Sequence, residues 1–340
     1  MAENFRPTAS WTTLHRRAEL VRRLRAFFDD LGFLEVTTPV WSRDSVVDRH
    51  LDPVPTRLSL NEADDPSAAV DSAAAFSGGS NLGWLQTSPE QHMKRLLAAG
   101  ARAIYQVTPV FRAGERGPLH NPEFTMAEWY RVGDDLEAGI TLLQTLTSAL
   151  LPDRGPVERI TYRQAFERHA GIDPWQVSDD ELCRLAASVS GTESLARPDD
   201  RDLCLDLMLV NRVEPQLGFQ APTIVYDYPA SQSALAQVRT LPDGRRVAER
   251  FELYIDGIEL ANGYHELLDA DELAGRTEQA NGERLAAGKT PLPGPRQLIA
   301  AMQAGLPACS GTALGVDRLI MVATGARTID EVLTFPYERA

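Results

Sequence analysis

VFRAGERGPLHNPEFTMAEWY, residues 110–130, contains two runs rich in β-branched and aromatic residues around a loop of glycine and proline. The first run begins near residue 103 and the second continues to residue 133. Such runs on either side of a short Gly/Pro segment are typical of paired antiparallel strands. We therefore predict a long β-hairpin over 103–133.

Further strands are predicted after this hairpin. Residues 223–229 (TIVYDYP) and 246–266 (RVAERFELYIDGIELANGYHE) have strand composition, and 312–325 (TALGVDRLIMVATG) reads as a strand or turn leading into a helix at Asp317. Hairpins dominate over alternation of strands with crossover helices. The fold class that follows is α+β, with an antiparallel sheet flanked by helices.

The N-terminal part predicts two helices and two β-segments. Residues 12–31 have apolar side chains at helical spacing, and 33–41 (FLEVTTPVW) read as a β-segment. Residues 84–100 read as strand, turn and helix. Ser88 is the expected N-cap of that helix and Pro89 its first residue.

One catalytic domain is the simplest organisation, because no Pro-rich or charged linker divides the chain. Its expected limits are 12–340, after an N-terminal tail over 1–11. Within it, the small polar residues of 61–83 predict a mobile loop between two strands, most simply a linker. Residues 134–215 read as a mostly helical insertion.

Composition argues against several classes of function. The net charge of −14 argues against a dedicated nucleic-acid surface, because such surfaces use Lys and Arg to neutralise phosphates. No apolar run is long enough for a membrane span, so no membrane partner is expected. Three widely spaced cysteines predict neither a disulfide framework nor a zinc site, which fits the cytoplasm. The P-loop, dinucleotide and serine-nucleophile motifs are also missing from the sequence.

Charged side chains interrupt three predicted strands, where a purely structural sheet would carry fewer. Arg112 and Arg318 supply guanidinium groups, which suit phosphate oxygens. Glu252 and Glu259 could hold the Mg²⁺ that accompanies a nucleoside triphosphate. Phe124 offers a flat face for adenine, with Arg318 on the other side.

An amine-bearing substrate would need carboxylates. Glu90, Glu128 and Glu266 are available, with the Tyr130 hydroxyl as a partner. Each residue alone has a structural explanation, since a strand glutamate usually faces solvent and a phenylalanine usually lies in the core. Their combination indicates a site where ATP activates an amino acid.

These stretches resemble the motifs of class II aminoacyl-tRNA synthetases. Residues 31–41 resemble motif 1, residues 110–130 resemble motif 2 in its lysyl form, and residues 311–321 (GTALGVDRLIM) resemble motif 3. Residues 87–100 and 257–267 are also similar to the lysyl type. The resemblance covers nearly the whole chain, and it is closest to the short paralogues of lysyl-tRNA synthetase, the elongation factor P lysine ligases.

This resemblance implies an ATP-dependent, AMP-forming ligase. It would activate (R)-β-lysine as an adenylate and transfer it to the ε-amine of one lysine of elongation factor P. Members of this group have no anticodon-binding OB-fold, and the helix that begins near residue 12 leaves no room for one. Motif 1 forms a dimer interface in this fold, so a homodimer is also implied.

The resemblance assigns roles to individual residues. Arg112 and Arg318 would be catalytic, and Glu252 and Glu259 would bind Mg²⁺. The positions implied for β-lysine or lysine are Ser88, Pro89, Glu90, Glu128, Tyr130, Asn262, Glu266 and Ala313. The positions implied for ATP are Arg112, Ala113, Gly114, Glu115, His120, Asn121, Phe124, Glu259, Leu260, Gly315 and Arg318.

Several positions depart from lysyl-tRNA synthetases. Gly114 stands where motif 2 has an acid, with Glu115 beside it, and Leu119 stands where a basic residue would contact the γ-phosphate. Ser88 and Ala313 stand where alanine and glycine are usual, in agreement with the paralogue. We expect these two residues to tune the choice between α- and β-amino acids.

Two other functions stay open from the sequence. The first is a lysine-activating ligase that acts on tRNA or another carrier, against which the missing anticodon domain and the acidic charge argue. The second is a non-catalytic, dimeric binding paralogue. The presence of Arg112, Glu252, Glu259 and Arg318 argues against it, because such a protein needs no phosphate or metal ligands.

Overall fold

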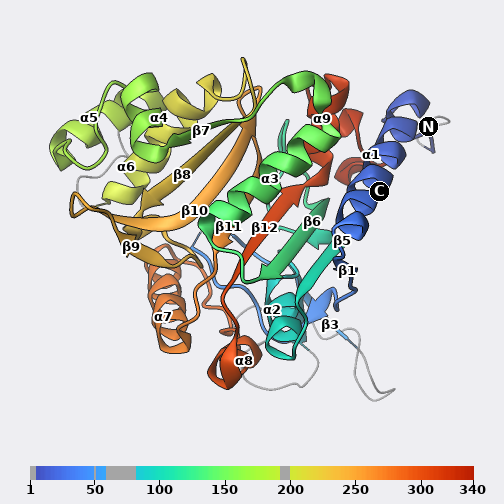
Figure 1. Cartoon of the computed structure of the whole chain (residues 1–340), viewed down its shortest axis with the longest axis horizontal. Coiled ribbons are helices and arrows are strands. Elements are labelled where there is room, and N and C mark those ends of the chain that lie inside the picture. The colour runs from blue at the N-terminus through green and yellow to red at the C-terminus, as the bar shows by residue number, and fades with distance from the viewer. Residues whose placement is uncertain (1–4, 50, 59–81, 192–199) are drawn as a thin grey trace.

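The computed structural model describes residues 5–49, 51–58, 82–191 and 200–340. These residues form two sheets flanked by helices (Figure 1). The strands of the main sheet are β1 (Leu34–Glu35), β5 (Ala103–Phe111), β6 (Glu123–Val132), β7 (Glu158–Thr161), β8 (Thr223–Pro229), β9 (Val238–Thr240), β10 (Arg246–Ile255), β11 (Ile258–His265) and β12 (Cys309–Gly315). The smaller sheet contains β2 (Trp41–Ser42), β3 (Pro55–Arg57) and β4 (Leu82–Leu85).

The helices within the described ranges fall into long and short ones. The α-helices are α1 (Trp11–Asp30), α2 (Glu90–Ala98), α3 (Leu136–Leu150), α4 (Tyr162–His169), α5 (Asp179–Ser190), α6 (Arg201–Met208), α7 (Ala270–Ala286), α8 (Arg296–Gly305) and α9 (Val316–Thr324). The short turns are η1 (Pro152–Arg154), η2 (Leu209–Val213, a π-helix), η3 (Glu214–Gln216), η4 (Ala230–Gln232), η5 (Ile329–Glu331) and η6 (Tyr337–Arg339).

The main sheet has the strand order β1-β5-β6-β12-β11-β10-β8-β7, with β9 paired to β10. The predicted hairpin is confirmed, because β5 and β6 pair antiparallel from Ala103 opposite Arg131 to Phe111 opposite Glu123. Only the two outer pairs, β1 with β5 and β7 with β8, run parallel among the described strands. The predicted α+β class with an antiparallel sheet is therefore confirmed.

Three hydrophobic clusters hold the helices on the sheet. The first joins α1, α3 and α9 to one face, through residues such as Phe28, Leu143 and Ile320. The second joins α4, α5 and α6 to β8 and β10, and the third joins α2 and α8 to β5, β6 and β12. In Figure 1, α3 crosses one face of the sheet, while α2, α7 and α8 lie together at its lower end.

The described parts of the segment 134–215, residues 134–191 and 200–215, are mostly helical, but they belong to different cores. Helix α3 packs in the first cluster with α1 and α9, and β7 joins the main sheet beside β8. Helices α4, α5 and α6 gather in the second cluster, together with Ile160 of β7 and with Leu209 and Val213 of η2. Residues 61–81 of the predicted loop lie outside the described residues, and Leu82 and Gly83 belong to β4.

Two local predictions differ from the structure. Residues 33–41 do not form one strand, because β1 pairs with β5 and β2 pairs with β4 in the other sheet, and Pro39 lies between them. Pro89, not Ser88, is the N-cap of α2. The Ser88 hydroxyl still accepts a hydrogen bond from the Glu90 amide at 3.1 Å, but it also donates to Glu128.

Candidate active site

The face of the main sheet opposite α3 forms the floor of a cleft of about 1180 Å³. Strand alternation explains this, because Trp129 points into the first hydrophobic cluster while Glu128 and Tyr130 point into the cleft. Most predicted site residues line it: Ser88, Glu90, Arg112, Glu115, His120, Asn121, Phe124, Glu128, Tyr130, Glu259, Leu260, Asn262, Glu266, Ala313, Gly315 and Arg318. Four predicted residues do not line it: Pro89, Ala113, Gly114 and Glu252.

We call the most deeply buried part of the cleft, lined by Glu90, Glu128, Tyr130 and Glu266, its closed end. Glu128 has 1% of its surface exposed. It accepts hydrogen bonds from the Ser88 hydroxyl and the Tyr130 hydroxyl, both at 2.7 Å. Burial, with a contribution from the nearby Glu90, raises the pKa of Glu128 to about 7. A buried carboxylate of this kind is suited to bind an ammonium group, which would compensate its charge.

Lys94 places a buried ammonium group beside two further carboxylates. Its Nζ forms ion pairs with Glu90 and, at 2.5 Å, with Glu266. Burial raises the pKa of Glu266 to about 8, although Lys94 opposes the shift. The sequence analysis did not include Lys94 in the site. The signal available was its place four residues after Glu90 on the buried side of a helix.

Gly311 is a second residue that the sequence analysis missed. It lies opposite Tyr130 in the ladder between β6 and β12. A Cβ atom at this position would lie 2.2 Å from Tyr130 Cε1 and 2.3 Å from Glu266 Oε1. Glycine therefore allows the hydroxyphenyl ring and the carboxylate to approach each other across β12.

Ala313 and Asn262 lie between the two ends of the cleft. Ala313 is opposite Asn262 on one side and opposite Glu128 on the other. Asn262 donates to the Tyr264 hydroxyl at 3.0 Å, while its buried Oδ1 accepts no hydrogen bond from the part of the chain described. This oxygen is thus an available acceptor in the cleft, separated from Glu128 by Ala313 of β12.

Arg112 and Phe124 form the other end of the cleft. The guanidinium carbon of Arg112 lies 5.1 Å from the centre of the Phe124 ring, and the Arg112 Nε is buried without a hydrogen-bond partner among the residues described. Glu115 lies 3.8 Å from the Arg112 guanidinium. Arg112 therefore lies over the Phe124 ring, which is the ring predicted to stack on adenine.

Arg318 is held at the same end by two backbone carbonyls and by His120. It donates to the Glu259 carbonyl at 2.8 Å and to the Leu119 carbonyl at 3.4 Å, and its Nη2 lies 2.8 Å from His120 Nε2. A guanidinium group can only donate, so His120 Nε2 accepts and the imidazole proton is on Nδ1. Burial, reinforced by Arg318, lowers the pKa of His120 and keeps the ring neutral.

Asp317 fixes the start of α9 beside this cluster. Its buried carboxylate accepts from the Thr125 amide at 2.6 Å and pairs with Arg17 of α1 at 2.5 Å. Thr125 follows Phe124 in β6, and Arg318 follows Asp317 in α9. The contact between Asp317 and Thr125 therefore connects the two elements that carry Phe124 and Arg318, which are both predicted to bind the nucleotide. Gly315 has room for a side chain in the protein alone, since an added Cβ would meet no atom closer than 3.8 Å. Any requirement for glycine there comes from a ligand.

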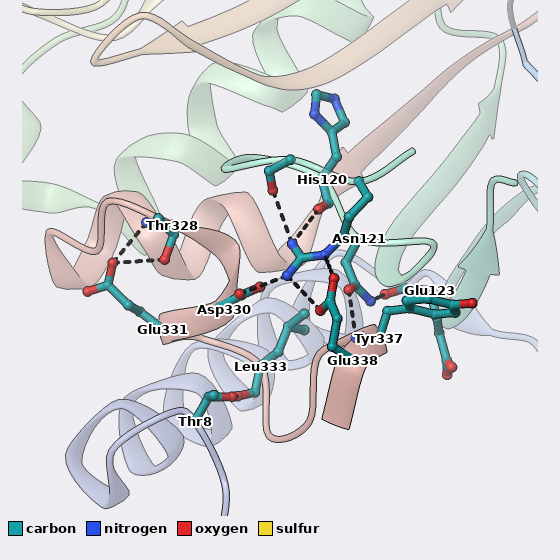
Figure 2. Close-up of polar contacts among 12 residues, drawn as sticks. Thr8, His120, Asn121, Glu123, Thr328, Asp330, Glu331, Leu333, Tyr337 and Glu338 are labelled. Carbon is teal, nitrogen blue, oxygen red and sulfur yellow. Dashed lines mark hydrogen bonds and ion pairs between the residues drawn. The ribbon is translucent and has the colours of Figure 1, made fainter. Parts of the chain in front are cut away.

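The loop between β5 and β6 forms polar contacts with the C-terminal residues, as Figure 2 shows. Arg116 pairs with Asp330 and Glu338 and also donates to the Gly117 and His120 carbonyls, each at 3.3 Å. Asn121 Oδ1 accepts from the Tyr337 amide at 3.0 Å. Gly114 adopts a φ of +79°, a conformation that glycine accommodates without strain.

The two glutamates predicted to bind metal differ in availability. The Glu259 side chain is 38% exposed, and its carboxylate has only a 3.5 Å contact with Arg318 among the described contacts. Glu252 is 3% exposed, and its carboxylate contacts Arg250 and the hydroxyls of Tyr228 and Tyr254. No cluster of three or more His, Cys, Asp or Glu with metal-binding geometry occurs in the described ranges. Glu259 fits a metal ligand as it stands, and Glu252 would have to exchange a partner.

Comparison with known proteins assigns this chain to a family. Residues 4–339 match the family of tRNA synthetases class II (D, K and N). The chain is 44% identical over 336 residues to a Klebsiella pneumoniae (strain 342) protein named elongation factor P--(R)-beta-lysine ligase, and the alignment covers 99% of this chain and 98% of that protein. Proteins of the same name from Salmonella paratyphi B (strain ATCC BAA-1250 / SPB7) and Salmonella choleraesuis (strain SC-B67) show the same identity and coverage.

Cys204 and Cys309 are buried, and Cys183 is partly buried. None of the helices described combines the length and apolar character that a membrane crossing requires. With the motif 2 hairpin, the motif 3 strand and helix, and a family match over nearly its full length, the chain belongs to the class II tRNA synthetases of the D, K and N type.

Proposed function

We propose that this protein is a cytoplasmic, ATP-dependent ligase that activates (R)-β-lysine and transfers it to the ε-amine of a lysine of elongation factor P. The names of the relatives support the acceptor and the amino acid. The observation that carries the proposal is the buried group of Glu90, Glu128, Glu266 and Tyr130 at the closed end of the cleft. Three buried carboxylates with one tyrosine hydroxyl suit a substrate with more than one ammonium group.

The activation step needs no general base. The substrate carboxylate is already ionised at neutral pH, so it can attack the α-phosphorus of ATP directly. The new bond forms between a carboxylate oxygen and phosphorus, and pyrophosphate leaves with the electron pair. Arg112 would stabilise the charge on the phosphoryl oxygens, and the amine end would orient the carboxylate for attack.

The transfer step forms an amide bond. The ε-amine of the acceptor lysine attacks the acyl carbon of the adenylate, loses a proton, and displaces AMP with the electron pair of the acyl–phosphate bond. Phe124, His120 and Arg318 would hold the nucleotide through both steps, since they line the other end of the cleft. Ala113, Gly114 and Pro89 lie outside the cleft lining, so any role of theirs would be through the backbone or through their neighbours.

Magnesium is proposed to accompany ATP, where it would neutralise charge on the phosphates. Glu259 is the carboxylate that we assign to it first, because the side chain is accessible from the cleft. Glu252 is seven residues earlier and would join only by giving up its contact with Arg250.

A homodimer is proposed from the surface on the side of α1. Large apolar side chains are exposed there: Trp11 on α1, Leu34 on β1, and Phe335 and Tyr337 near the C-terminus. Figure 1 shows α1, β1 and both ends of the chain on one side of the molecule. A second copy is the simplest cover for this surface, because the sequence there resembles motif 1 of a dimeric family.

The experiment that tests the proposed function is acyl transfer with radiolabelled (R)-β-lysine or lysine. The protein is incubated with ATP, Mg²⁺ and either elongation factor P or lysine tRNA. We expect label on elongation factor P, more with (R)-β-lysine than with lysine. Label on tRNA instead, or no label on either acceptor, would contradict the proposal.

A further inference from the structure

Lys94 is the only lysine or arginine side chain in the described residues that forms ion pairs with the carboxylates at the closed end of the cleft. Its side chain is 3% exposed, and its ammonium group lies between Glu90 of the same helix and Glu266 after β11. Although burial opposes the charge, Glu266 and Glu90 keep the pKa of Lys94 above its usual value. Lys94 is therefore a permanent cation of the pocket.

The other groups that face this pocket come from three strands. They are Glu128 and Tyr130 of β6, Tyr264 of β11 and Cys309 of β12. Burial holds the pKa values of the tyrosine and cysteine groups above their ordinary values, so these groups stay neutral at physiological pH. The formal charge of the pocket is thus set by Glu90, Glu128, Glu266 and Lys94.

We propose that Lys94 is a positioning residue that sets the charge of the amino-acid pocket to minus two, and so selects substrates with two ammonium groups. When all four groups are ionised, as binding of a dication favours, three carboxylates and one ammonium group leave two negative charges. The proposal rests on the proposed function, because it concerns the same amino-acid substrate. It adds the residue that determines how many positive charges the substrate must bring.

The chemistry of activation explains why two charges matter. Once the substrate carboxylate is joined to AMP, a diamino acid keeps two ammonium groups, and both are ionised at neutral pH. These two cations compensate the two remaining carboxylate charges. An amino acid with a single amine would leave one buried carboxylate without a counter-charge, which is costly in a poorly solvated pocket.

Lys94 contacts two of the three carboxylates in the pocket. It bridges Glu90 and Glu266, whereas Glu128 is held by Ser88 and Tyr130. Without the ammonium group, Glu90 and Glu266 would face each other with no cation between them. Like charges at close range disfavour each other's ionisation, so one carboxylate would keep its proton to a higher pH than it does beside Lys94.

The test is ATP–pyrophosphate exchange between pH 6 and pH 9 with Lys94→Met, which keeps the length of the side chain and removes its charge. We expect the KM for the diamino acid to rise at least about tenfold at pH 7, the effect of one unit of carboxylate pKa. The fall in this KM with rising pH should shift to higher pH than in the unmodified protein, because Lys94 no longer favours the ionised form of Glu266. The KM for ATP should not change.

Arg95→Met is the matched control, because it removes an exposed cation from the same helix outside the cleft lining. A second variant, Lys94→Met with Glu266→Gln, removes both partners of one ion pair and again leaves two negative charges. Removing a whole buried pair is tolerated better than removing one partner, so this variant keeps the test open if Lys94→Met does not fold. We expect it to bind the diamino acid more tightly than Glu266→Gln alone.

The proposal is supported if the double variant binds the diamino acid more tightly than Glu266→Gln and if the pH dependence of KM shifts in Lys94→Met. A purely structural role of Lys94 predicts instead that the losses of affinity in the two single variants add. An unchanged amino-acid KM and pH profile in Lys94→Met would overturn it while leaving the proposed function intact. A double variant weaker than both single variants would also overturn it. If no diamino acid supports ATP–pyrophosphate exchange by the unmodified protein, the proposed function and this inference both fail.

Discussion

Arg116 and Glu338 form a two-point ion pair, with Arg116 Nε 2.7 Å from one carboxylate oxygen of Glu338 and Nη2 2.8 Å from the other. Asp330 contacts the same guanidinium group at 2.8 Å. The pair connects the loop of the β5–β6 hairpin to the end of the chain, 222 residues later (Figure 2). Arg116 also holds the carbonyls of Gly117 and His120, so the C-terminal residues fix the shape of the predicted ATP loop.

Arg116→Ala is expected to weaken ATP binding without affecting the amino acid. The loop would lose its support, and His120 and Asn121 would be less well placed for the nucleotide. We expect the KM for ATP to rise about five- to tenfold, roughly 1 kcal/mol of binding free energy. ATP–pyrophosphate exchange with varied ATP and varied amino acid separates the two KM values.

Two further variants check that the pair acts as a unit. Glu338→Ala combined with Arg116→Ala should be no worse than Arg116→Ala alone, because both variants break the same contact. Arg168→Ala removes a remote surface pair with Glu158 and serves as control. Equal effects of Arg116→Ala and Arg168→Ala on the KM for ATP would contradict the prediction.

Gly311→Ala is expected to abolish amino-acid activation. The new methyl group would occupy space 2.2 Å from Tyr130 Cε1 and 2.3 Å from Glu266 Oε1, so one of these side chains must move. Displacements of this size at a reacting site cost about 100-fold in rate, and we expect kcat/KM for the amino acid to fall at least that far. Binding of ATP, measured by calorimetry, should persist.

Gly282→Ala is the matched control for this substitution. Gly282 lies inside α7 with no atom within 4 Å of an added Cβ. Alanine favours a helix interior over glycine by about 0.5–1 kcal/mol, so this variant should melt at a slightly higher temperature with normal activity. Normal amino-acid activation by Gly311→Ala would show that the pocket can accommodate the methyl group.

The KM for the amino acid is expected to depend on pH through the buried carboxylates. The pKa of Glu128 is raised to about 7 and that of Glu266 to about 8, so each is protonated below its value and ionised above it. An ammonium substrate needs the ionised form, and its KM should therefore fall as the pH rises from 6 to 8. A KM independent of pH over this range would contradict the assignment of these carboxylates to the amine.

In Ser88→Ala, the fall of the amino-acid KM with rising pH should occur at higher pH. The Ser88 hydroxyl donates to Glu128 and lowers its pKa, in opposition to burial. Loss of the donor raises the pKa of Glu128 further, so the fall in KM shifts to higher pH. A pH profile identical to that of the unmodified protein would mean that the hydroxyl does not stabilise the carboxylate.

Ala313→Gly tests the choice between the two lysine isomers. The Ala313 methyl group is next to both Asn262 and Glu128 in the sheet register, where the backbone of the amino acid would lie. Removing it should change the ratio of kcat/KM for (R)-β-lysine to that for lysine by several-fold, and Ser88→Ala should change the same ratio. Competition between labelled isomers measures this ratio, and an unchanged value in both variants would refute the role of these positions.

Local pattern was sufficient for much of the fold and of the site. Strand β8 occupies the residues predicted for it, and α1 lies within one residue of the predicted helix. The β5–β6 hairpin and the β12–α9 unit could be predicted from the sequence. The alternation of polar and apolar residues, the turn residues and the helix periodicity are patterns of a few neighbouring positions. Cleft residues such as Arg112, Glu128 and Arg318 lie on these units, so motif spacing was enough to select them.

Contacts between distant segments were decided only by the tertiary structure. Lys94 joins Glu266 from another element, Gly311 meets Tyr130 through strand register, and Arg116 meets Glu338 at the far end of the chain. Sequence patterns report the direction of a side chain relative to its own strand or helix, and they do not report which side chain faces it from elsewhere. That depends on sheet order and register, which put Arg112 over Phe124 and left Glu252 enclosed by Tyr228, Tyr254 and Arg250.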